Sequence, residues 1–448
     1  METISFTLNG SKTTYSGDPS ARLLDILRTD MHLCGTKSGC KEGECGACSL
    51  LIDGQLINSC LVAMGSLHNA TIVTIEGKTP HFAALDKAYS AVSAIQCGFC
   101  TPGMIMASEA LLSSNPNPSP AQIREAISGN LCRCTGYNSI VRAIGLASHD
   151  IKKDKDLGGQ PPNPRKLLKK FDQNFDLVGV LRGLRGDSSL VPYAGGTDLM
   201  VGALGEGVSF LFLRDVFEMR QIVRDDEFIR IGAACSFSEI IESPLVPAIL
   251  CDACHKIGAP AIRNAGTIGG NIANASAKAD SALVCLVADA KLRLAKAGHD
   301  GHIEERIIPI KDFYLGHKRT ALTPGELIIE ILIPRSVSLD NYCYTKIGAR
   351  KALAISCISF AGIMEIRDGI IRHCATAFGA ISDIILRFEE PDSMMIGKSI
   401  LEASNIKDAY LAAYDSAIVP IRGRVSAAYR KDVCMNLLTE FLAQNGIK

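Results

Sequence analysis

Short apolar runs separated by turn residues fill much of the first eighty positions of the chain. They occupy residues 4–8, 49–52, 56–57 and 72–75, and Asp53-Gly54 joins the second run to the third. Runs of this length are typical of strands, and Asp-Gly between two of them is a strong signal for a hairpin turn. The pattern therefore predicts a small mixed sheet in this region.

Helix signals replace this pattern from residue 80 onward. Thr101 is placed to cap a helix whose first residue is Pro102, a position where the missing N–H of proline does no harm. Ser119, followed by Pro120 and then by Gln122, matches a capping box at the start of another helix. This stretch is therefore predicted to be helical.

Residues 150–164 combine charged side chains with paired glycine and paired proline. Because that composition is typical of a solvated linker, we expect the main domain boundary there. Glycine-rich turns separate the apolar runs that follow, which predicts alternating helices and strands. The runs lie at 209–213, 283–294 and 327–333, with strands near 342–347 and 356–366 and a helix over 431–442.

The charge balance excludes several classes of protein. The 448 residues include 47 basic and 47 acidic side chains, so the formal net charge is zero and gives no electrostatic footprint for nucleic acid or an anionic membrane. The start of the chain lacks a signal-peptide pattern, and no stretch approaches the roughly 18 apolar residues of a membrane span. We therefore expect a cytoplasmic protein of about two to four domains that binds neither nucleic acid nor membranes.

Eight of the seventeen cysteines form two tight groups before residue 135. The first group is Cys40, Cys45 and Cys48 in C-x4-C-x2-C spacing with Cys60 downstream, which is the plant-type ferredoxin spacing of a 2Fe-2S cluster. Glycines in the loop let the backbone curl and aim N–H groups at the cluster's sulfurs. Zinc is the alternative, although zinc sites usually pair two C-x2-C knuckles. Cys34 does not fit the group and is expected to be a buried apolar side chain.

The second group consists of Cys97 and Cys100, followed by Cys132 and Cys134. Each pair lies at an interruption beside a predicted helix. The N-terminal dipole and free amides of the helix after Cys100 favour an anionic, thiolate-bound cluster. C-x2-C with C-x-C again provides four ligands, but spacing alone leaves zinc open as an alternative.

Two glycine-rich segments follow the linker, at residues 194–199 and 264–271. Neither has the Rossmann G-x-G-x-x-G spacing. Paired glycines form backbone-amide nests that hold a pyrophosphate in some proteins. Taken alone, each segment is more simply an ordinary turn.

Together these motifs resemble those of the molybdenum hydroxylases, the xanthine dehydrogenase and aldehyde oxidase family. Residues 39–48 resemble the family's N-terminal 2Fe-2S domain, and residues 96–103 and 129–137 look like the signature of its second 2Fe-2S domain, in the family's order. The two glycine-rich segments are similar to the loops of its flavin domain. Further matches extend the resemblance to nearly the whole chain.

The resemblance implies an α+β multidomain chain that carries three cofactors. The implied parts are a β-grasp ferredoxin-like 2Fe-2S domain at 1–78, a helical-bundle 2Fe-2S domain at 79–150, a linker at 151–163, an α/β FAD-binding domain at 164–335 and a C-terminal α+β flavoprotein domain at 336–448. The eight grouped cysteines would ligate two 2Fe-2S clusters, and FAD rather than NAD would be the tightly held nucleotide. The residues implied to bind FAD are Ala194, Gly195, Gly196, Thr197, Asp198, Leu199, Thr267, Gly269, Gly270, Asn271, Ser276, Asp280, Ile328 and Lys346.

The resemblance also implies an oxidoreductase subunit rather than a complete enzyme. Substrate would be hydroxylated on a large molybdopterin-binding partner subunit. Gln96 and Cys134 of this chain would face the pterin of that partner. Electrons would then pass through the helical-domain cluster, the ferredoxin-like cluster and FAD to NAD or another acceptor. Ile257 and the apolar stretch 352–354 depart from the xanthine-oxidising members, which leaves NAD and a purine substrate in question. Two other hypotheses are a stand-alone iron-sulfur flavin NADH diaphorase and a non-enzymatic zinc-binding scaffold.

Overall fold

The computed structural model describes residues 3–153, 176–202, 207–300, 302–350, 352–423 and 425–448. The described residues group into two compact units. The first unit draws on Met1–Phe175, Ser189–Asp215 and Gly258–Gly266, and the second on Asp176–Ser188, Val216–Ile257 and Thr267–Lys448. The predicted linker at 151–163 lies almost wholly outside the described residues, and the bounds of the five predicted segments stay predictions.

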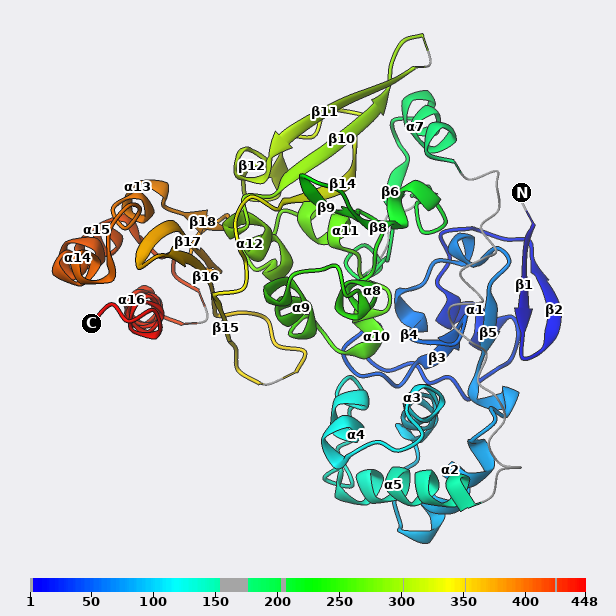
Figure 1. Cartoon of the computed structure of the whole chain (residues 1–448). Coiled ribbons are helices and arrows are strands. Elements are labelled where there is room, and N and C mark those ends of the chain that lie inside the picture. The colour runs from blue at the N-terminus through cyan, green and yellow to red at the C-terminus, as the bar shows by residue number, and fades with distance from the viewer. Residues whose placement is uncertain (1–2, 154–175, 203–206, 301, 351, 424) are drawn as a thin grey trace. The chain divides into compact units, whose positions relative to one another are not determined.

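A five-stranded sheet in the order β2-β1-β5-β3-β4 opens the first unit (Figure 1). Its elements are β1 (Ile4–Leu8), β2 (Ser11–Tyr15), helix α1 (Leu23–Thr29), β3 (Ser49–Ile52), β4 (Gln55–Asn58) and β5 (Thr71–Val73), with 3-10 turns η1 (Ser59–Leu61), η2 (Met64–Leu67) and η3 (Ile75–Gly77). Strands β1 and β5 pair in parallel and the other neighbours antiparallel, so the predicted mixed sheet is confirmed. Asp53 and Gly54, both at positive φ, form the two-residue turn between β3 and β4 that was predicted.

Four helices follow the sheet: α2 (Phe82–Ala91), α3 (Thr101–Ser114), α4 (Pro120–Ala126) and α5 (Asn138–Lys153). The capping box predicted at Ser119 is confirmed, because its hydroxyl accepts from the N–H of Gln122 and its own N–H donates to the Gln122 side chain. The cap predicted at Thr101 is wrong by one residue. Cys100 occupies the N-cap position of α3 instead, without a capping hydrogen bond from its side chain, and Pro102 lies in the first turn, where no N–H is required.

The first unit also includes two segments from beyond residue 175. Strands β6 (Val191–Tyr193) and β7 (Phe210–Phe212) form a parallel pair, and α10 (Pro260–Arg263) is a short helix. Their buried side chains Tyr193 and Met200 share an apolar cluster with Cys48, Cys60 and Leu61 of the cysteine-bearing region. The chain therefore returns twice to the unit that holds both cysteine groups.

The described residues of the second unit form two large antiparallel sheets, the two-stranded antiparallel sheet β12-β13, and the helices that pack on the large sheets (Figure 1). The first sheet has the order β11-β10-β14-β9-β8 and the second the order β15-β16-β17-β18. The elements around the first sheet are α7 (Leu177–Gly186), η5 (Phe217–Arg220), β8 (Ile222–Arg224), β9 (Phe228–Gly232), α8 (Phe237–Glu242), α9 (Ala248–His255), α11 (Ile268–Ala273), α12 (Asp280–Val287), β10 (Lys291–Ala297), β11 (Ile303–Pro309), η6 (Ile310–Asp312), β12 (Tyr314–Gly316), β13 (Arg319–Thr320) and β14 (Leu327–Pro334). Helices and strands are mixed along this stretch, and the predicted run at 283–294 divides into the end of α12 and the start of β10.

The second sheet of this unit buries one face against the C-terminal helices. Its elements are β15 (Tyr342–Ile347), β16 (Ile358–Arg367), β17 (Ile370–Gly379), β18 (Leu386–Arg387), α13 (Glu389–Ser393), α14 (Ile400–Asn405), α15 (Lys407–Ala417) and α16 (Ala427–Gln444). Phe360 and Phe378 of the strands pack with Tyr414 and Phe441 of the helices in one buried cluster. The strands predicted near 342–347 and 356–366 and the C-terminal helix are confirmed, and β17 completes the hairpin that the sequence did not reveal.

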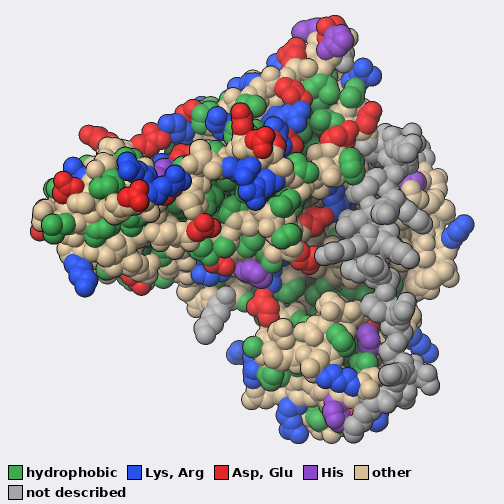
Figure 2. Space-filling view, in the orientation of Figure 1, with side chains coloured by type: hydrophobic (Ala, Val, Ile, Leu, Met, Phe, Trp, Pro, Cys, Tyr) green, Lys and Arg blue, Asp and Glu red, His purple; other side chains and the backbone are tan. Residues whose placement is uncertain are grey.

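The surface agrees with the even charge balance of the sequence. Figure 2 shows basic and acidic side chains intermingled on the face in view. Within the described part of the chain, no helix is both long enough and apolar enough to cross a membrane.

Candidate functional site

The loop before β3 brings Cys40 and Cys45 together. The backbone N–H of Cys40 donates to Sγ of Cys45, and the N–H groups of Glu42 and Cys45 donate to Sγ of Cys40, each at 3.4 Å. Gly43 and Gly46 hold φ angles of +76° and +65°, which side chains beyond glycine rarely adopt. The loop therefore curls so that its own amides point at the sulfurs.

The four thiols of the first group interact as two pairs. A hydrogen bond from the Cys45 thiol lowers the pKa of Cys40 to about 5, and one from the Cys60 thiol lowers the pKa of Cys48. The donors Cys45 and Cys60 have raised pKa values for the same reason. The charge of Cys40 also acts on the other pair, so all four sulfurs belong to one electrostatic site.

The second group is also arranged as two pairs. Sγ of Cys134 lies 3.6 Å from Sγ of Cys97, and Cys100 shares a hydrogen bond with Cys132. Burial, followed by that bond, raises the pKa of Cys100 to about 12. Burial alone would also raise the pKa of Cys132, but hydrogen bonds with Thr135, whose Oγ1 lies 3.2 Å from the sulfur, help to lower it.

This arrangement in pairs fits a cluster of two irons. The four cysteine ligands of a 2Fe-2S cluster divide two to each iron, whereas a structural zinc ion takes all four around one centre. That these eight cysteines ligate two 2Fe-2S clusters stays a prediction.

The two groups differ in exposure. Cys48 and Cys60 are buried, while Cys97 and Cys134 are exposed. Apolar side chains near the exposed pair also face solvent, with Phe99 48% exposed and Leu131 45% exposed. Gln96 is exposed in the same region.

The first glycine-rich segment, 194–199, follows β6 in the first unit. Gly196 has a φ of +69°, and a Cβ added there would lie 2.6 Å from the carbonyl oxygen of Leu61. A Cβ on Gly195 would lie 1.9 Å from the carbonyl oxygen of Ala265. Both glycines are therefore required by close backbone approach, and the turn they form is held against the segment that carries Cys60.

The second glycine-rich segment belongs to the first unit up to Gly266 and to the second unit from Thr267 onward, where it forms the start of α11. Thr267 caps this helix by accepting from the N–H of Gly270. Gly269 packs on Ala233, where a Cβ would lie 2.6 Å from the carbonyl oxygen. Asn271 is fixed by a 2.7 Å hydrogen bond from Ser281. A Cβ on Gly270 would meet only the Thr267 hydroxyl, so this glycine presents open backbone.

Asp280 and Lys346 form a buried ion pair in the second unit. Nζ of Lys346 lies 2.7 Å from Oδ2 of Asp280 and donates to the carbonyl oxygen of Lys256 at 2.8 Å. The other Asp280 oxygen accepts from Ser356 at 3.1 Å. The side chains of Asp280 and Lys346 are 4% and 8% exposed, so the pair joins α12 to β15 in addition to any role toward a cofactor.

Two further residues predicted to bind FAD lie near these elements. Ile328 is buried in β14, and Ser276 precedes α12, where its hydroxyl accepts from the N–H of Lys278. Cys34, in contrast, contradicts its prediction, because it is exposed beside the first cysteine loop. Its environment is a polar turn in which its carbonyl oxygen accepts from Arg28 and Lys37.

Comparison with known proteins agrees with the four parts expected from the sequence. Residues 6–67 match the family described as 2Fe-2S iron-sulfur cluster binding domain, and residues 74–145 match the [2Fe-2S] binding domain. Residues 176–336 match the FAD binding domain in molybdopterin dehydrogenase, and residues 343–445 match the CO dehydrogenase flavoprotein C-terminal domain.

Individual relatives point the same way. The nicotinate dehydrogenase small FeS subunit of Eubacterium barkeri is 44% identical over 147 residues, which cover 32% of this chain and 94% of that protein. The chain belongs to the molybdenum hydroxylase family. Its matched parts are two 2Fe-2S domains, an FAD-binding domain and a flavoprotein C-terminal domain.

Longer members of the molybdenum hydroxylase family match most of the chain. Xanthine dehydrogenase/oxidase of Mus musculus is 26% identical over 465 residues, which cover 86% of this chain but only 34% of that protein. The chain thus spans about a third of this relative. A solved structure, reconstituted CO dehydrogenase from Oligotropha carboxidovorans, superposes with a TM-score of 0.51 at 25% identity over 59% of this chain and 91% of the other.

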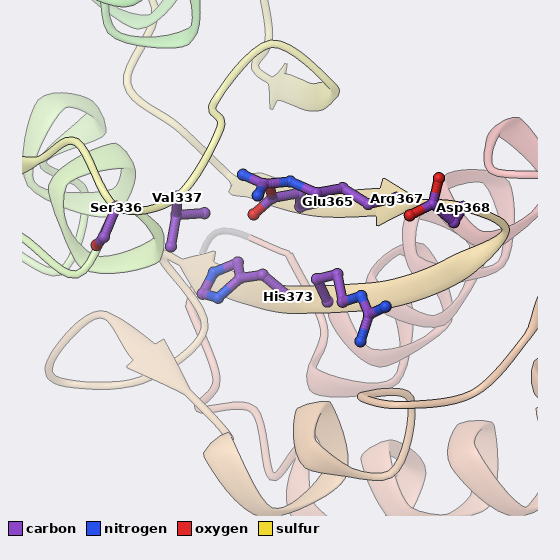
Figure 3. Close-up of a pocket in the computed structure, with 7 residues that line it drawn as sticks. Ser336, Val337, Glu365, Arg367, Asp368 and His373 are labelled. Carbon is purple, nitrogen blue, oxygen red and sulfur yellow. The ribbon is translucent and has the colours of Figure 1, made fainter.

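A cavity of about 450 Å³ lies elsewhere in the second unit and contains none of the predicted site residues. Figure 3 shows Glu365 and Arg367 on one strand, His373 on the next, and Ser336 and Val337 on the facing loop. Burial lowers the pKa of His373. Most of the side chains that line this cavity are charged, so the cavity does not suit the ring system of a flavin. We therefore assign the cavity no part in the cofactor sites.

Sequence reasoning missed residues that join the cofactor loops. The hydroxyl of Tyr193 donates to the carbonyl oxygen of Leu61 at 3.0 Å and accepts from the N–H of Ala63 at 3.2 Å. Arg22 donates to the carbonyl oxygens of Met200 and Gly202 just beyond the first glycine segment. Neither residue lies in a recognisable motif, and their partners are more than one hundred residues away, so no local signal could have identified them.

Proposed function

We propose that this chain relays electrons from a large molybdopterin-binding partner subunit, through two 2Fe-2S clusters and FAD, to NAD or another acceptor. When bound, the clusters exchange single electrons and the flavin collects two, which it is able to release as a hydride. The observation that carries the proposal is the placement of both cysteine groups and the first glycine-rich segment within one compact unit.

The proposed ligands are the residues that the motifs indicate. Cys40, Cys45, Cys48 and Cys60 would hold one cluster, and Cys97, Cys100, Cys132 and Cys134 the other. The amide-to-sulfur hydrogen bonds of the first loop would stabilise ligated thiolates. The residues proposed to bind FAD are those that the resemblance implies: Ala194, Gly195, Gly196, Thr197, Asp198, Leu199, Thr267, Gly269, Gly270, Asn271, Ser276, Asp280, Ile328 and Lys346.

The surface near Cys97 and Cys134 is the proposed docking site of the partner subunit. Exposed apolar side chains beside exposed cysteines favour a protein interface, because such patches are uncommon on isolated surfaces. Phe99 and Leu131 would be covered in the hetero-oligomer, and Gln96 would approach the pterin. The similarity to a small FeS subunit supports a multi-subunit enzyme.

The last step of the proposed relay passes electrons from FAD to an acceptor. Ile257 and the 352–354 stretch are apolar where xanthine-oxidising members carry aromatic or acidic residues, and Ile355 beside that stretch is 56% exposed. The proposal therefore covers NAD and other acceptors alike. The substrate would be chosen by the partner subunit, and a cytoplasmic location stays a prediction.

Anaerobic purification of the tagged chain from its native cells tests the proposed assembly. We expect a co-purifying large chain that contains molybdenum and pterin, and we expect Phe99→Ser with Leu131→Ser to reduce its recovery while the iron content of the tagged chain is kept. Leu315→Ser, at another exposed apolar residue, is the matched control. Full NADH-dependent reduction of dyes by a chain that recovers no molybdenum-containing partner would instead support the stand-alone diaphorase.

A further inference from the structure

The two cysteine loops touch each other inside the first unit. The backbone N–H of Leu131 donates to the carbonyl oxygen of Cys45 at 2.9 Å. Leu131 directly precedes Cys132, so one hydrogen bond connects the backbone of a residue in the first group with the backbone next to a residue in the second. This contact is independent of any side-chain conformation at the surface.

Glycines make this contact possible. A Cβ on Gly46 would lie 2.4 Å from the carbonyl oxygen of Gly129, and a Cβ on Gly103 would lie 2.2 Å from the carbonyl oxygen of Gly46. Separations this short exclude any side chain. The first cysteine loop, the turn before Cys132 and the first turn of α3 therefore meet backbone to backbone.

Asn130 is the side chain that locks the two loops together. It is 3% exposed, and its Nδ2 donates to the carbonyl oxygen of Gly46 at 3.0 Å and to Oγ of Ser49 at 3.2 Å. Ser49 in turn lies 3.2 Å from Oδ1 of Asn58, whose Nδ2 donates to the carbonyl oxygen of Gly43 at 3.0 Å. A buried network thus runs from the second cysteine loop to both glycines of the first.

Such a network has a specific mechanical consequence. Both hydrogens of the Asn130 amide are used by groups of the first loop and of β3, and every member of the network is buried, so water offers no replacement partner. Rotation or withdrawal of one loop would leave several polar groups unpaired. The separation of the two loops is therefore fixed more tightly than apolar packing alone would fix it.

We propose that Asn130 is a positioning residue that sets the separation of the two cluster sites and holds the Leu131–Cys45 hydrogen bond as the connection between them. The inference rests on the proposed electron relay. One electron passing between the sites oxidises one cluster and reduces the other, and no bond or proton is exchanged. Its rate depends steeply on separation, so a residue that controls the separation controls the rate.

Asn130→Ala and Asn130→Asp in the full chain test this role, with Asn117→Ala at an exposed asparagine of the same helical region as control. Two quantities are measured besides activity: the spin–spin splitting between the two reduced clusters by EPR, and the inter-cluster electron-transfer rate after flash reduction. We expect unchanged iron content, a smaller splitting and an electron-transfer rate about 10- to 100-fold lower, which is the size of the loss in activity when an outer-shell partner of a metal site is removed. The control keeps wild-type values.

An unchanged splitting and rate in an Asn130 variant that retains its iron would overturn the proposal and leave Asn130 a purely structural residue. If neither variant folds, Ser49→Ala, which removes one acceptor of the same amide, is measured in the same way, and wild-type values there would also overturn it. Failure of the proposed relay has a different signature, because wild-type protein would then show no pair of 2Fe-2S signals.

Discussion

At the scale of single residues, the cofactor loops depend on buried polar groups with long-range partners. Tyr193 links β6 to the segment after Cys60 and is 2% exposed. Its ring centroid lies 5.0 Å from that of Phe210 in a tilted contact and 5.3 Å from that of Phe212 in an edge-on contact. Its hydroxyl satisfies one buried acceptor and one buried donor. Removal of a partner from a buried polar group costs more than the hydrogen bond itself contributes.

Tyr193→Phe keeps the aromatic packing and removes only that hydroxyl. We expect it to lower the free energy of unfolding of the first unit by about 1–3 kcal/mol, because Leu61 and Ala63 lose their shared partner. Denaturant unfolding followed through the visible absorption of the clusters measures this change. Tyr429→Phe, at a half-exposed tyrosine, is the control, and equal stability of both variants would contradict the assignment.

Asp392 makes a prediction about pH in the C-terminal part of the second unit. Burial raises its pKa to about 6 from an ordinary value of 3.8, although Tyr414 and Thr376 hydrogen bond to it. The Asp392 carboxyl group therefore binds its proton more tightly in the folded state than in the unfolded state. The resulting stabilisation is complete below pH 3.8 and is lost as the pH rises through 6.

The expected loss is roughly 3 kcal/mol between these limits, because one pKa unit corresponds to about 1.4 kcal/mol. Asp392→Asn should flatten this fall in unfolding free energy between about pH 4 and pH 6. Thermal unfolding across that range measures the slope, with Asp408→Asn at an exposed site as control. A slope identical to that of wild type would show that Asp392 does not titrate in this range.

At the scale of elements, α12 and β15 are joined by the ion pair of Asp280 and Lys346 and not by apolar contact alone. Both residues were predicted only as FAD ligands. Their burial shows that each neutralises the other inside the second unit. The pair therefore supports the flavin region even before any cofactor is considered.

Lys346→Met leaves the Asp280 carboxylate buried without its cation. We expect a loss of about 3–5 kcal/mol in unfolding stability, because breaking one side of a buried pair strands a charge. Lys346→Met with Asp280→Asn should recover most of this loss, since neither charge then remains. Lys278→Met is the exposed control, and the test is chemical unfolding of the FAD-free protein. A stable single variant that merely loses FAD would contradict the structural role.

The elements also show what the sequence could and could not predict. Strands β1, β3 and β15 and the Ser119 capping box were predictable because their signals are local: apolar runs, turn residues and a short capping pattern. Helix α1 and strand β17 gave no such signal. The residues that join loops across the fold, Asn130 and Tyr193, were not predictable, because their partners lie about eighty to one hundred and thirty positions away.

At the scale of the whole molecule, the cysteine spacing and the family resemblance led to the same assignment. Spacing alone predicted the first cluster but left zinc open for the second. The pairing of thiols in both groups and the family matches now favour 2Fe-2S chemistry at each. The position of segment 194–199 within the unit of the two cysteine groups could be seen only in the fold, because the linker separates them in sequence.

The most direct test of the account is the cofactor content of the anaerobically purified chain. We expect about four irons and four acid-labile sulfides, as two 2Fe-2S clusters require, with one extractable FAD per chain. Cys48→Ser should lose about two of the irons, and Cys34→Ser, outside both groups, should lose none. Zinc in place of iron, clearly fewer than about four irons in wild type, or absence of FAD would contradict the account.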